Sequence, residues 1–226
     1  MALGIPTLAT PTVGAGGTST TTASFTPTLG ALLLALGACR GSSLPGVLTL
    51  NPSALTWTPI ISGLYDNGAS PRVRGRMWAA VVSSASAMTV QVTSTSAGKV
   101  ALSIVQITGA AGIPSNYAEA NDGSGDPTAT LPSAPAASST VIGLYAAAGA
   151  AAMTPPSGYT ELDEQVTNSD LITEVVYDAG SAATSAAWTS ATNTRSIGLL
   201  VEIQESSGAG RIVRRPSRRF SHMMVR

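Results

Sequence analysis

The chain has 226 residues, of which only 11% are charged, and its twelve lysines and arginines balance its twelve aspartates and glutamates. A single cysteine excludes an internal disulfide, and a single histidine leaves no Cys/His set with zinc-ligand spacing. The most apolar run, residues 29–39, is too short to cross a bilayer as a helix, which takes about 20 residues, so no membrane association is expected.

The first 17 residues are too irregular for a helix. Pro6 and Pro11 interrupt them, and glycines follow at positions 14, 16 and 17. Because Leu3 and Ile5 are apolar, we expect this segment to be held against a surface. Residues 1–17 are therefore predicted to form an extended N-terminal arm that lies on the body of the protein or on a neighbour.

The next hundred residues predict antiparallel strands. Residues 31–40 place Leu32, Leu34 and Leu36 on one face, as in a buried strand, and Cys39 in the same run is expected to be a small core residue. The other strands of this part are expected at residues 18–26, 55–61, 72–83, 88–93 and 100–108.

Arginines alternate with apolar residues in the strand predicted at residues 72–83. Arg72, Arg74 and Arg76 therefore share one strand face. Arginine makes directional contacts to carboxylates and phosphates, and the chain has only one lysine. We interpret the three arginines as a candidate partner-binding stripe, with a solvated sheet face as the alternative.

Residues 109–139 have no sustained apolar period and are rich in glycine, proline, alanine and serine. A connection of this length usually has a function or contributes to an interface. Within it, residues 121–126 (Asn-Asp-Gly-Ser-Gly-Asp) resemble a calcium loop but lack the terminal bidentate glutamate. We expect a plain turn and no metal.

Strands resume at residues 141–146, 159–165, 171–177, 187–190 and 197–203. About ten short strands without helices predict an all-β fold, an antiparallel β-sandwich of jelly-roll-like type. No repeat is long enough to indicate a propeller or solenoid. The expected domain spans residues 18–204, with arms at residues 1–17 and 205–226.

The sequence argues against an enzyme. The only histidine, His222, lies in the C-terminal tail, and there is no nucleophile elbow or phosphate-binding loop. Glu161, Asp163 and Glu164 could pair as glycosidase carboxylates, with Glu161 and Asp163 on one strand face. We favour a solvated strand, and expect no catalytic residues and no cofactor.

The tail that follows residue 210 is strongly basic. It holds six of the twelve cations and no acid, so the first 210 residues carry six cations against twelve acids. The apolar residues between the arginines favour an extended arm that binds a protein surface or sheet edge over an arm that binds nucleic acid. The predicted partner-binding residues of this arm are Arg211, Arg214, Arg215, Arg218, Arg219, Phe220 and Arg226.

Several segments resemble β-sandwich structural proteins of tailed phages. They are residues 19–26, 30–37 (Gly-Ala-Leu-Leu-Leu-Ala-Leu-Gly), 55–58 (Leu-Thr-Trp-Thr), 76–79 (Arg-Met-Trp-Ala) leading to 88–90 (Met-Thr-Val), 158–161 (Gly-Tyr-Thr-Glu) and 197–203 (Ile-Gly-Leu-Leu-Val-Glu-Ile). The resemblance covers roughly residues 18–204 and implies a multicopy virion protein that decorates the capsid or belongs to the tail. Its expected partners are other copies of itself and other virion proteins.

Two alternatives remain open at this point. A carbohydrate- or receptor-binding module of a phage adhesin would use exposed aromatic residues, although Trp57, Trp78 and Trp188 are scattered and expected in the core or at an interface. An arm that contacts the packaged genome would instead use its arginines to neutralise phosphates.

Overall fold

The computed structural model describes residues 2–41, 48–51, 55–66, 71–96, 98–178, 183–190 and 192–206. Every regular element in these residues is a β-strand. The strands are β1 (Thr7–Gly16), β2 (Ser19–Thr21), β3 (Leu32–Gly41), β4 (Leu48–Asn51), β5 (Thr58–Tyr65), β6 (Arg72–Val81), β7 (Gln91–Ser94), β8 (Lys99–Ile107), β9 (Tyr117–Asp122), β10 (Thr128–Thr130), β11 (Thr140–Ala148), β12 (Tyr159–Thr167), β13 (Leu171–Asp178), β14 (Ser185–Ala187) and β15 (Thr194–Ile203).

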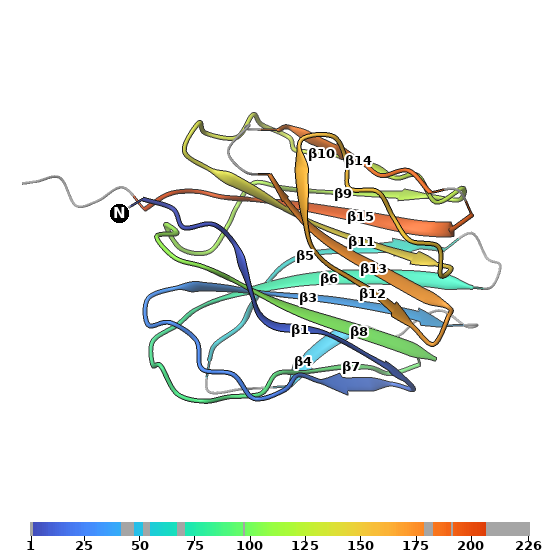
Figure 1. Cartoon of the computed structure of the whole chain (residues 1–226), viewed down its shortest axis with the longest axis horizontal. Coiled ribbons are helices and arrows are strands. Elements are labelled where there is room, and N and C mark those ends of the chain that lie inside the picture. The colour runs from blue at the N-terminus through green and yellow to red at the C-terminus, as the bar shows by residue number, and fades with distance from the viewer. Residues whose placement is uncertain are drawn as a thin grey trace, which may run out of the picture.

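The strands form four stacked layers (Figure 1). Two five-stranded antiparallel sheets face each other at the centre, with the orders β1-β8-β3-β6-β5 and β12-β13-β11-β15-β9. A three-stranded sheet, β2-β7-β4, covers the outer face of the first, and a two-stranded sheet, β10-β14, covers the outer face of the second. The predicted all-β antiparallel sandwich is confirmed.

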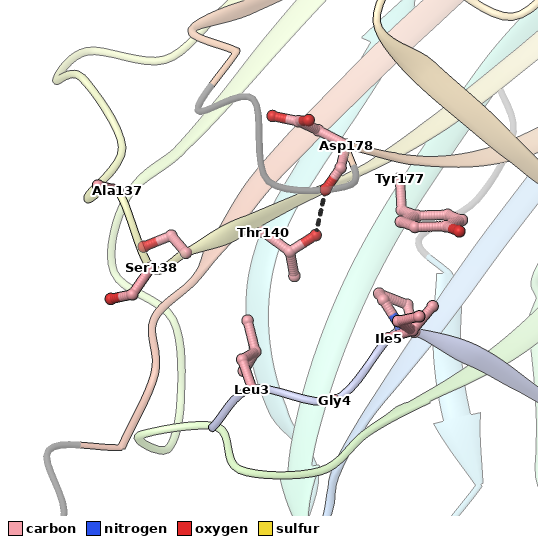
Figure 2. A pocket seen from close by; sticks show the side chains of 10 residues that line it. Leu3, Gly4, Ile5, Ala137, Ser138, Thr140, Tyr177 and Asp178 are labelled. Atoms are coloured by element: carbon pink, nitrogen blue, oxygen red, sulfur yellow. Dashed lines mark hydrogen bonds between the residues drawn. The ribbon is translucent and has the colours of Figure 1, made fainter. Parts of the chain in front are cut away.

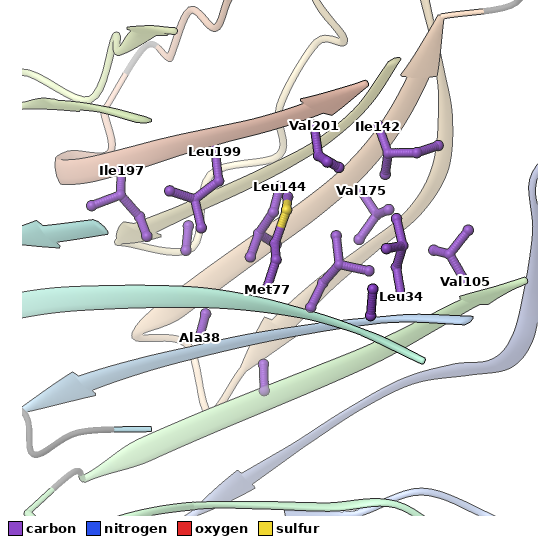
Figure 3. Packing of buried hydrophobic residues seen from close by; sticks show 14 of the residues in the cluster. Leu34, Ala38, Met77, Val105, Ile142, Leu144, Val175, Ile197, Leu199 and Val201 are labelled. Carbon is purple, nitrogen blue, oxygen red and sulfur yellow. The ribbon is translucent and has the colours of Figure 1, made fainter. Parts of the chain in front are cut away.

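The main core lies between the two five-stranded sheets. Leu34 and Met77 from the first sheet meet Leu144, Val175 and Leu199 from the second (Figure 3). Each of these side chains is essentially inaccessible to solvent, and burying a leucine or methionine stabilises the fold by about 1.5–3 kcal/mol. The shared buried face predicted for Leu32, Leu34 and Leu36 is confirmed.

Each five-stranded sheet has a second core on its outer face. Leu33, Cys39 and Trp78 belong to the outer core of the first sheet, and Tyr145 and Trp188 to that of the second. The central strands β3 and β11 are thus buried on both faces, which explains their nearly continuous apolar sequences. Cys39 is confirmed as a core residue, and its burial raises the pKa of the thiol to about 11.

The two halves of the chain have the same topology. In chain order, β1, β3, β5, β6 and β8 build the first large sheet, and β9, β11, β12, β13 and β15 build the second. When the strands of each large sheet are numbered in chain order, both sheets have the same spatial order: first, fifth, second, fourth and third. The small sheets follow the same plan, because β2 and β10 come after the first strand and β7 and β14 come before the fifth.

Sequence and strand register agree with this correspondence. Residues 33–41 (Leu-Leu-Ala-Leu-Gly-Ala-Cys-Arg-Gly) match residues 141–149 (Val-Ile-Gly-Leu-Tyr-Ala-Ala-Ala-Gly), which aligns Leu36 with Leu144. Residues 104–107 (Ile-Val-Gln-Ile) likewise match residues 200–203 (Leu-Val-Glu-Ile). The pairings are consistent with both matches. Leu36 lies opposite Ser103, the residue before the first tetrapeptide, and Leu144 lies opposite Leu199, the residue before the second.

A β-bulge occurs at the same place in both halves. The ladder between β5 and β6 shifts just before Ile61, which lies opposite Met77. The ladder between β12 and β13 shifts just before Asp163, which lies opposite Val175. Since Met77 and Val175 are the partners of the aligned leucines on β3 and β11, the bulges are equivalent. The chain is a structural duplication.

The first half has jelly-roll pairing. Among β1 to β8, the order β1-β8-β3-β6 in one layer and β2-β7-β4 in the other is that of a jelly roll, with β5 added beside β6. The predicted jelly-roll character therefore belongs to the first half, residues 7–107, and the second half, residues 117–203, repeats the same order without a counterpart of β4. The two halves share the central core, in place of the single jelly roll expected over residues 18–204.

The expected N-terminal arm, residues 1–17, is largely strand β1, an edge strand of the first large sheet paired with β8. Its prolines are tolerated because an edge strand leaves one side unpaired, and the register shifts between Leu8 and Thr10 and between Thr10 and Val13. The body therefore begins well before residue 18.

The expected loop at residues 109–139 contains two strands, β9 and β10. β9 lies at the edge of the second large sheet and alternates between exposed and half-buried residues, so it lacks the apolar period that would have marked it. Three strand predictions in the first half were too long or displaced, because β2 ends at Thr21, β5 begins at Thr58 and β7 begins at Gln91.

Candidate interaction surface

Charge is divided between the two halves and the tail. Residues 1–110 carry five cations and one acid, a formal charge of +4, whereas residues 111–206 carry one cation and eleven acids, a formal charge of −10. Residues 207–226 carry six cations and no acid, a formal charge of +6, and the three sums cancel. The acidic excess is therefore confined to the half that contains the second large sheet.

The three arginines share one face of β6, as expected, and this is the outer face of the first large sheet, where they are engaged within the chain. Arg72 pairs with Asp66. Arg76 donates to the Leu48 carbonyl oxygen at 2.9 Å and lies over the ring of Trp78, 5.3 Å from its centre. The bond from Arg76 to Leu48 holds the small sheet against the large one, because Leu48 belongs to β4.

Arg74 lies between them and is also half-buried. Its Nε is buried and has no hydrogen-bond partner among the described residues. All three side chains are therefore largely committed to the packing of the first half. They do not form an open patch of positive charge.

The β-bulge separates the carboxylates that the sequence placed together. Asp163 Oδ2 accepts a 2.7 Å hydrogen bond from the Thr12 amide of β1, on the side of the central core. Glu164 Oε2 accepts one of 2.6 Å from the Met153 amide, on the side of the outer core. The expectation that Glu161 and Asp163 share a strand face is therefore wrong, because the extra residue in the bulge reverses the alternation.

A third glutamate, which the sequence did not single out, joins Glu161 and Glu164. Glu174 is fully buried and lies opposite Glu164 on the neighbouring strand, and neither of its carboxyl oxygens has a hydrogen bond of normal geometry. Burial, and then the charges of Glu161 and Glu164, raise the pKa of Glu174 to about 7, although the Trp188 indole N–H lies close enough to lower it somewhat. Desolvation, and then the charges of Glu164 and Asp163, raise the pKa of Glu161.

These three glutamates do not amount to a hydrolytic site. Glu174 is the counterpart of Arg76 in the first half and is covered by the outer core that contains Trp188. None of the three lines either of the two best-formed hollows among the described residues. The arrangement gives no support to paired-carboxylate chemistry.

Residues 121–126 form a hydrogen-bonded turn. Asp122 Oδ1 accepts bonds from the Ser124 amide at 2.6 Å and the Asp126 amide at 3.2 Å, and Ser124 Oγ donates to the same oxygen. These bonds lower the pKa of Asp122. Asp126 in turn accepts a 2.7 Å bond from the Ser190 amide. Within the described residues no three Asp, Glu, His or Cys side chains are placed to hold a metal ion.

A hollow of about 270 Å³ opens beside the N-terminal segment (Figure 2). Thr140 Oγ1 donates to the Asp178 carbonyl oxygen at 2.6 Å across it, and Asp178 Oδ2 accepts from the Ala183 amide at 2.7 Å. Because its polar groups are occupied in this way, the hollow offers mainly apolar contact. It is lined by Leu3, Gly4, Ile5, Pro6, Ala137, Ser138, Ser139, Thr140, Tyr177 and Asp178.

The predicted binding residues of the tail lie outside the described residues; they are Arg211, Arg214, Arg215, Arg218, Arg219, Phe220 and Arg226. The place where the tail begins is described. The Ser206 amide donates to the Gly109 carbonyl oxygen at 2.7 Å, and Glu205 bridges to Ala110. Gly109 lies against the backbone of Ala2, so the tail begins beside the N-terminal segment.

The tryptophans do not form a binding platform. Trp78 and Trp188 are buried in the two outer cores, and Trp57 is half-buried beside the first of them.

The described residues contain no helix long and apolar enough to cross a membrane. Comparison with protein-family models, with curated proteins and with solved structures found no match.

Proposed function

We propose that the chain is a non-enzymatic structural protein of a tailed-phage virion, which decorates the capsid or forms part of the tail in many copies. Its partners are other copies of itself and other virion proteins, which it holds through the basic C-terminal arm. The observation that carries this proposal is the division of charge, −10 over residues 111–206 against +6 over residues 207–226.

The proposal follows from how opposite charge on one chain acts between copies. A copy that carries both a cationic arm and an acidic half can bind one neighbour through its arm and receive the arm of another, and such head-to-tail contacts build rings or filaments. Apolar residues within the arm, including Phe220, add burial to the electrostatic attraction. The low overall content of charged residues suits a surface that neighbours largely cover.

The carbohydrate-binding alternative has less support. Sugars stack on exposed aromatic faces, whereas two of the three tryptophans are fully enclosed. The arginine stripe on β6 supports the assembly proposal only indirectly, because its contacts stabilise the first half.

Light scattering of the full chain, beside a version that ends at Gly210, tests the proposal. We expect the full chain to associate at low salt and to dissociate as salt rises, because screening weakens contacts between exposed charges. The shortened chain should remain monomeric throughout. Monomers in both cases would overturn self-association through the arm.

The virion assignment has a separate test. Mass spectrometry of purified particles of the phage that encodes the chain should detect it in stoichiometric amount, and its absence would overturn the assignment. Binding of the full chain to DNA, with a steep loss of affinity as salt rises, would instead indicate an arm that contacts the genome.

A further inference from the structure

The small outer sheets of the two halves differ at one edge. In the first half, β7 lies between β2 and β4. In the second half, β14 pairs with β10 on one side only, and on its other side the described residues supply a single bridge, between Thr154 and Thr189. The position that β4 fills in the first half therefore holds no strand in the described part of the second.

The backbone of β14 is turned toward this open position. The Thr184 carbonyl oxygen and the Trp188 amide bond to the segment of β10. Because successive residues of a strand direct their backbone groups to opposite sides, Ser185, Ala187 and Thr189 direct theirs away from β10. We refer to residues 185–189 as the β14 edge.

A hollow of about 420 Å³ runs along the β14 edge. Its other wall is residues 154–157, the segment that corresponds to β4 in the first half. Pro155 and Pro156 lie where β4 has residues with amide N–H groups, and a proline cannot donate to a strand ladder. This explains why the segment makes one bridge and no strand. The hollow is lined by Thr154, Pro155, Pro156, Ser157, Ser185, Ala187 and Thr189.

We propose that the β14 edge accepts an added strand from the basic arm of a second copy of this chain, at residues 211–215. This inference rests on the proposed function and names the receptor of the arm. The segment Arg-Ile-Val-Arg-Arg is as long as the β14 edge, where it would replace the bridge from Thr154 to Thr189, and Pro216 after it would end the ladder. Strand addition of this kind derives its affinity from backbone hydrogen bonds.

Charge and apolar pattern both fit this occupant. Asp126 bonds to Ser190 at one end of the β14 edge, and Glu164 bonds to Met153 beside Thr154 at the other wall, so acids stand near the incoming arginines. In β4 of the first half, Leu48 and Leu50 pack against the outer core.

The arm supplies one apolar side chain to the outer core, where β4 supplies two. Ile212 and Val213 are adjacent, so whichever register the strand adopts, one of them faces the outer core and the other faces outward. The two registers differ in which of the two is buried and in which arginines share its face: Arg214 with Ile212, or Arg211 and Arg215 with Val213.

Disulfide trapping between full-length chains tests the proposal. Chains carrying A187C are mixed with chains carrying V213C or I212C under oxidising conditions, and cross-linked dimers are identified by mass spectrometry. Ala187 is exposed, and one of the two arm positions shares its face in an antiparallel pair. We expect at least tenfold more dimer than with T49C, an exposed position on β4, in place of A187C.

Equal trapping with T49C would overturn the proposal. Trapping only within single chains that carry both A187C and V213C would also overturn it, because the arm would then dock on its own body.

The substitution Ala187→Pro gives a second test in the full chain. It removes an amide directed at the open side and leaves the ladder to β10, so we expect loss of self-association with little change in the thermal unfolding midpoint. If the full chain associates through its arm and Ala187→Pro does not weaken that association, the β14 edge is not the receptor of the arm, while the proposed function stands. If the full chain never associates, the proposed function itself fails.

Discussion

Gln106 and Glu202 occupy the same place in the two halves of this protein. The Oε1 of Gln106 accepts a hydrogen bond from the Thr28 amide at 2.7 Å, and the Oε1 of Glu202 accepts one from the Ala136 amide at 2.9 Å. The turn that supplies each amide is also repeated, since Ala31 donates to the Thr28 carbonyl oxygen and Ser139 to that of Ala136. The duplication therefore extends from topology to individual hydrogen bonds.

The second half has elaborated this contact. Glu202 also accepts from Ser139 Oγ and from Asn116 Nδ2, the latter at 2.8 Å, and is almost completely buried. Burial alone would raise the pKa of Glu202, but the bonds from Ser139, Asn116 and Ala136 together lower it. Glu202 thus ties the start of the second half to its last strand.

Glu202→Gln should destabilise the protein by about 1–3 kcal/mol at neutral pH, because the new amide group must face at least one of the buried donors. Because the pKa of Glu202 is lower in the folded state, its stabilisation is present above the unfolded pKa and is lost as pH falls through the folded one. Urea unfolding between pH 3 and 7 should show a shallower acid-side loss in Glu202→Gln than in the parent.

The matched control is Glu119→Gln, at an exposed position on β9. This variant should unfold within about 0.5 kcal/mol of the parent, as is usual for surface substitutions. Equal effects of the two substitutions would contradict the role given to the Glu202 contacts.

Glu174→Gln should stabilise the protein above pH 7. Burial and the facing charges of Glu161 and Glu164 raise the pKa of Glu174 to about 7, so the folded state holds a proton that the unfolded state releases near its ordinary value. Stability due to this group is therefore full below the unfolded pKa and is lost as pH rises through the folded one. The loss is on the order of 3 kcal/mol.

Urea unfolding at pH 5 and pH 8.5 measures this effect. The parent should lose stability between the two pH values, and Glu174→Gln should lose less. Tyr145 and Trp188 pack on the same side and remain neutral at these pH values, so they do not change how the free energy of unfolding depends on pH. Parallel pH profiles would show that Glu174 does not titrate as described.

Gly198→Ala should destabilise the protein by about 1–3 kcal/mol, the usual cost of overpacking a core. An added Cβ would lie 2.6 Å from an atom of the Trp188 ring, and that ring is enclosed by the outer core of the second half. Thermal unfolding measures the change.

Gly98→Ala is the control for this substitution. Its Cβ would meet nothing closer than 3.8 Å, so the unfolding midpoint should stay near that of the parent. An unchanged midpoint in Gly198→Ala would mean that Trp188 can move away from the sheet.

Cys39 should be almost unreactive in the native protein. Burial raises the pKa of its thiol to about 11, so only about one molecule in a thousand carries the thiolate at pH 8. Labelling with a thiol reagent at pH 8 should therefore be slow in buffer and fast in denaturant. Rapid labelling in buffer would indicate that the outer core of the first half opens.

The sequence alone determined the strand content and the buried faces of the central strands. Leu32, Leu34 and Leu36 recur with a period of two, and that spacing places them on one face whatever the strand pairs with. The same local rule gave the arginine alternation on β6, and composition alone gave the basic tail.

Only the tertiary structure decided which strands are neighbours, and with it the duplication. Short matches such as Ile-Val-Gln-Ile and Leu-Val-Glu-Ile are evidence of a duplication only once strand pairing shows that they lie at equivalent positions. Glu161 and Asp163 were assigned to one face because alternation is a local rule, and the bulge that separates them exists only in the ladder with β13. The open β14 edge could not be predicted from the sequence either, because the absence of a counterpart to β4 is recognised only when the two halves of the structure are compared.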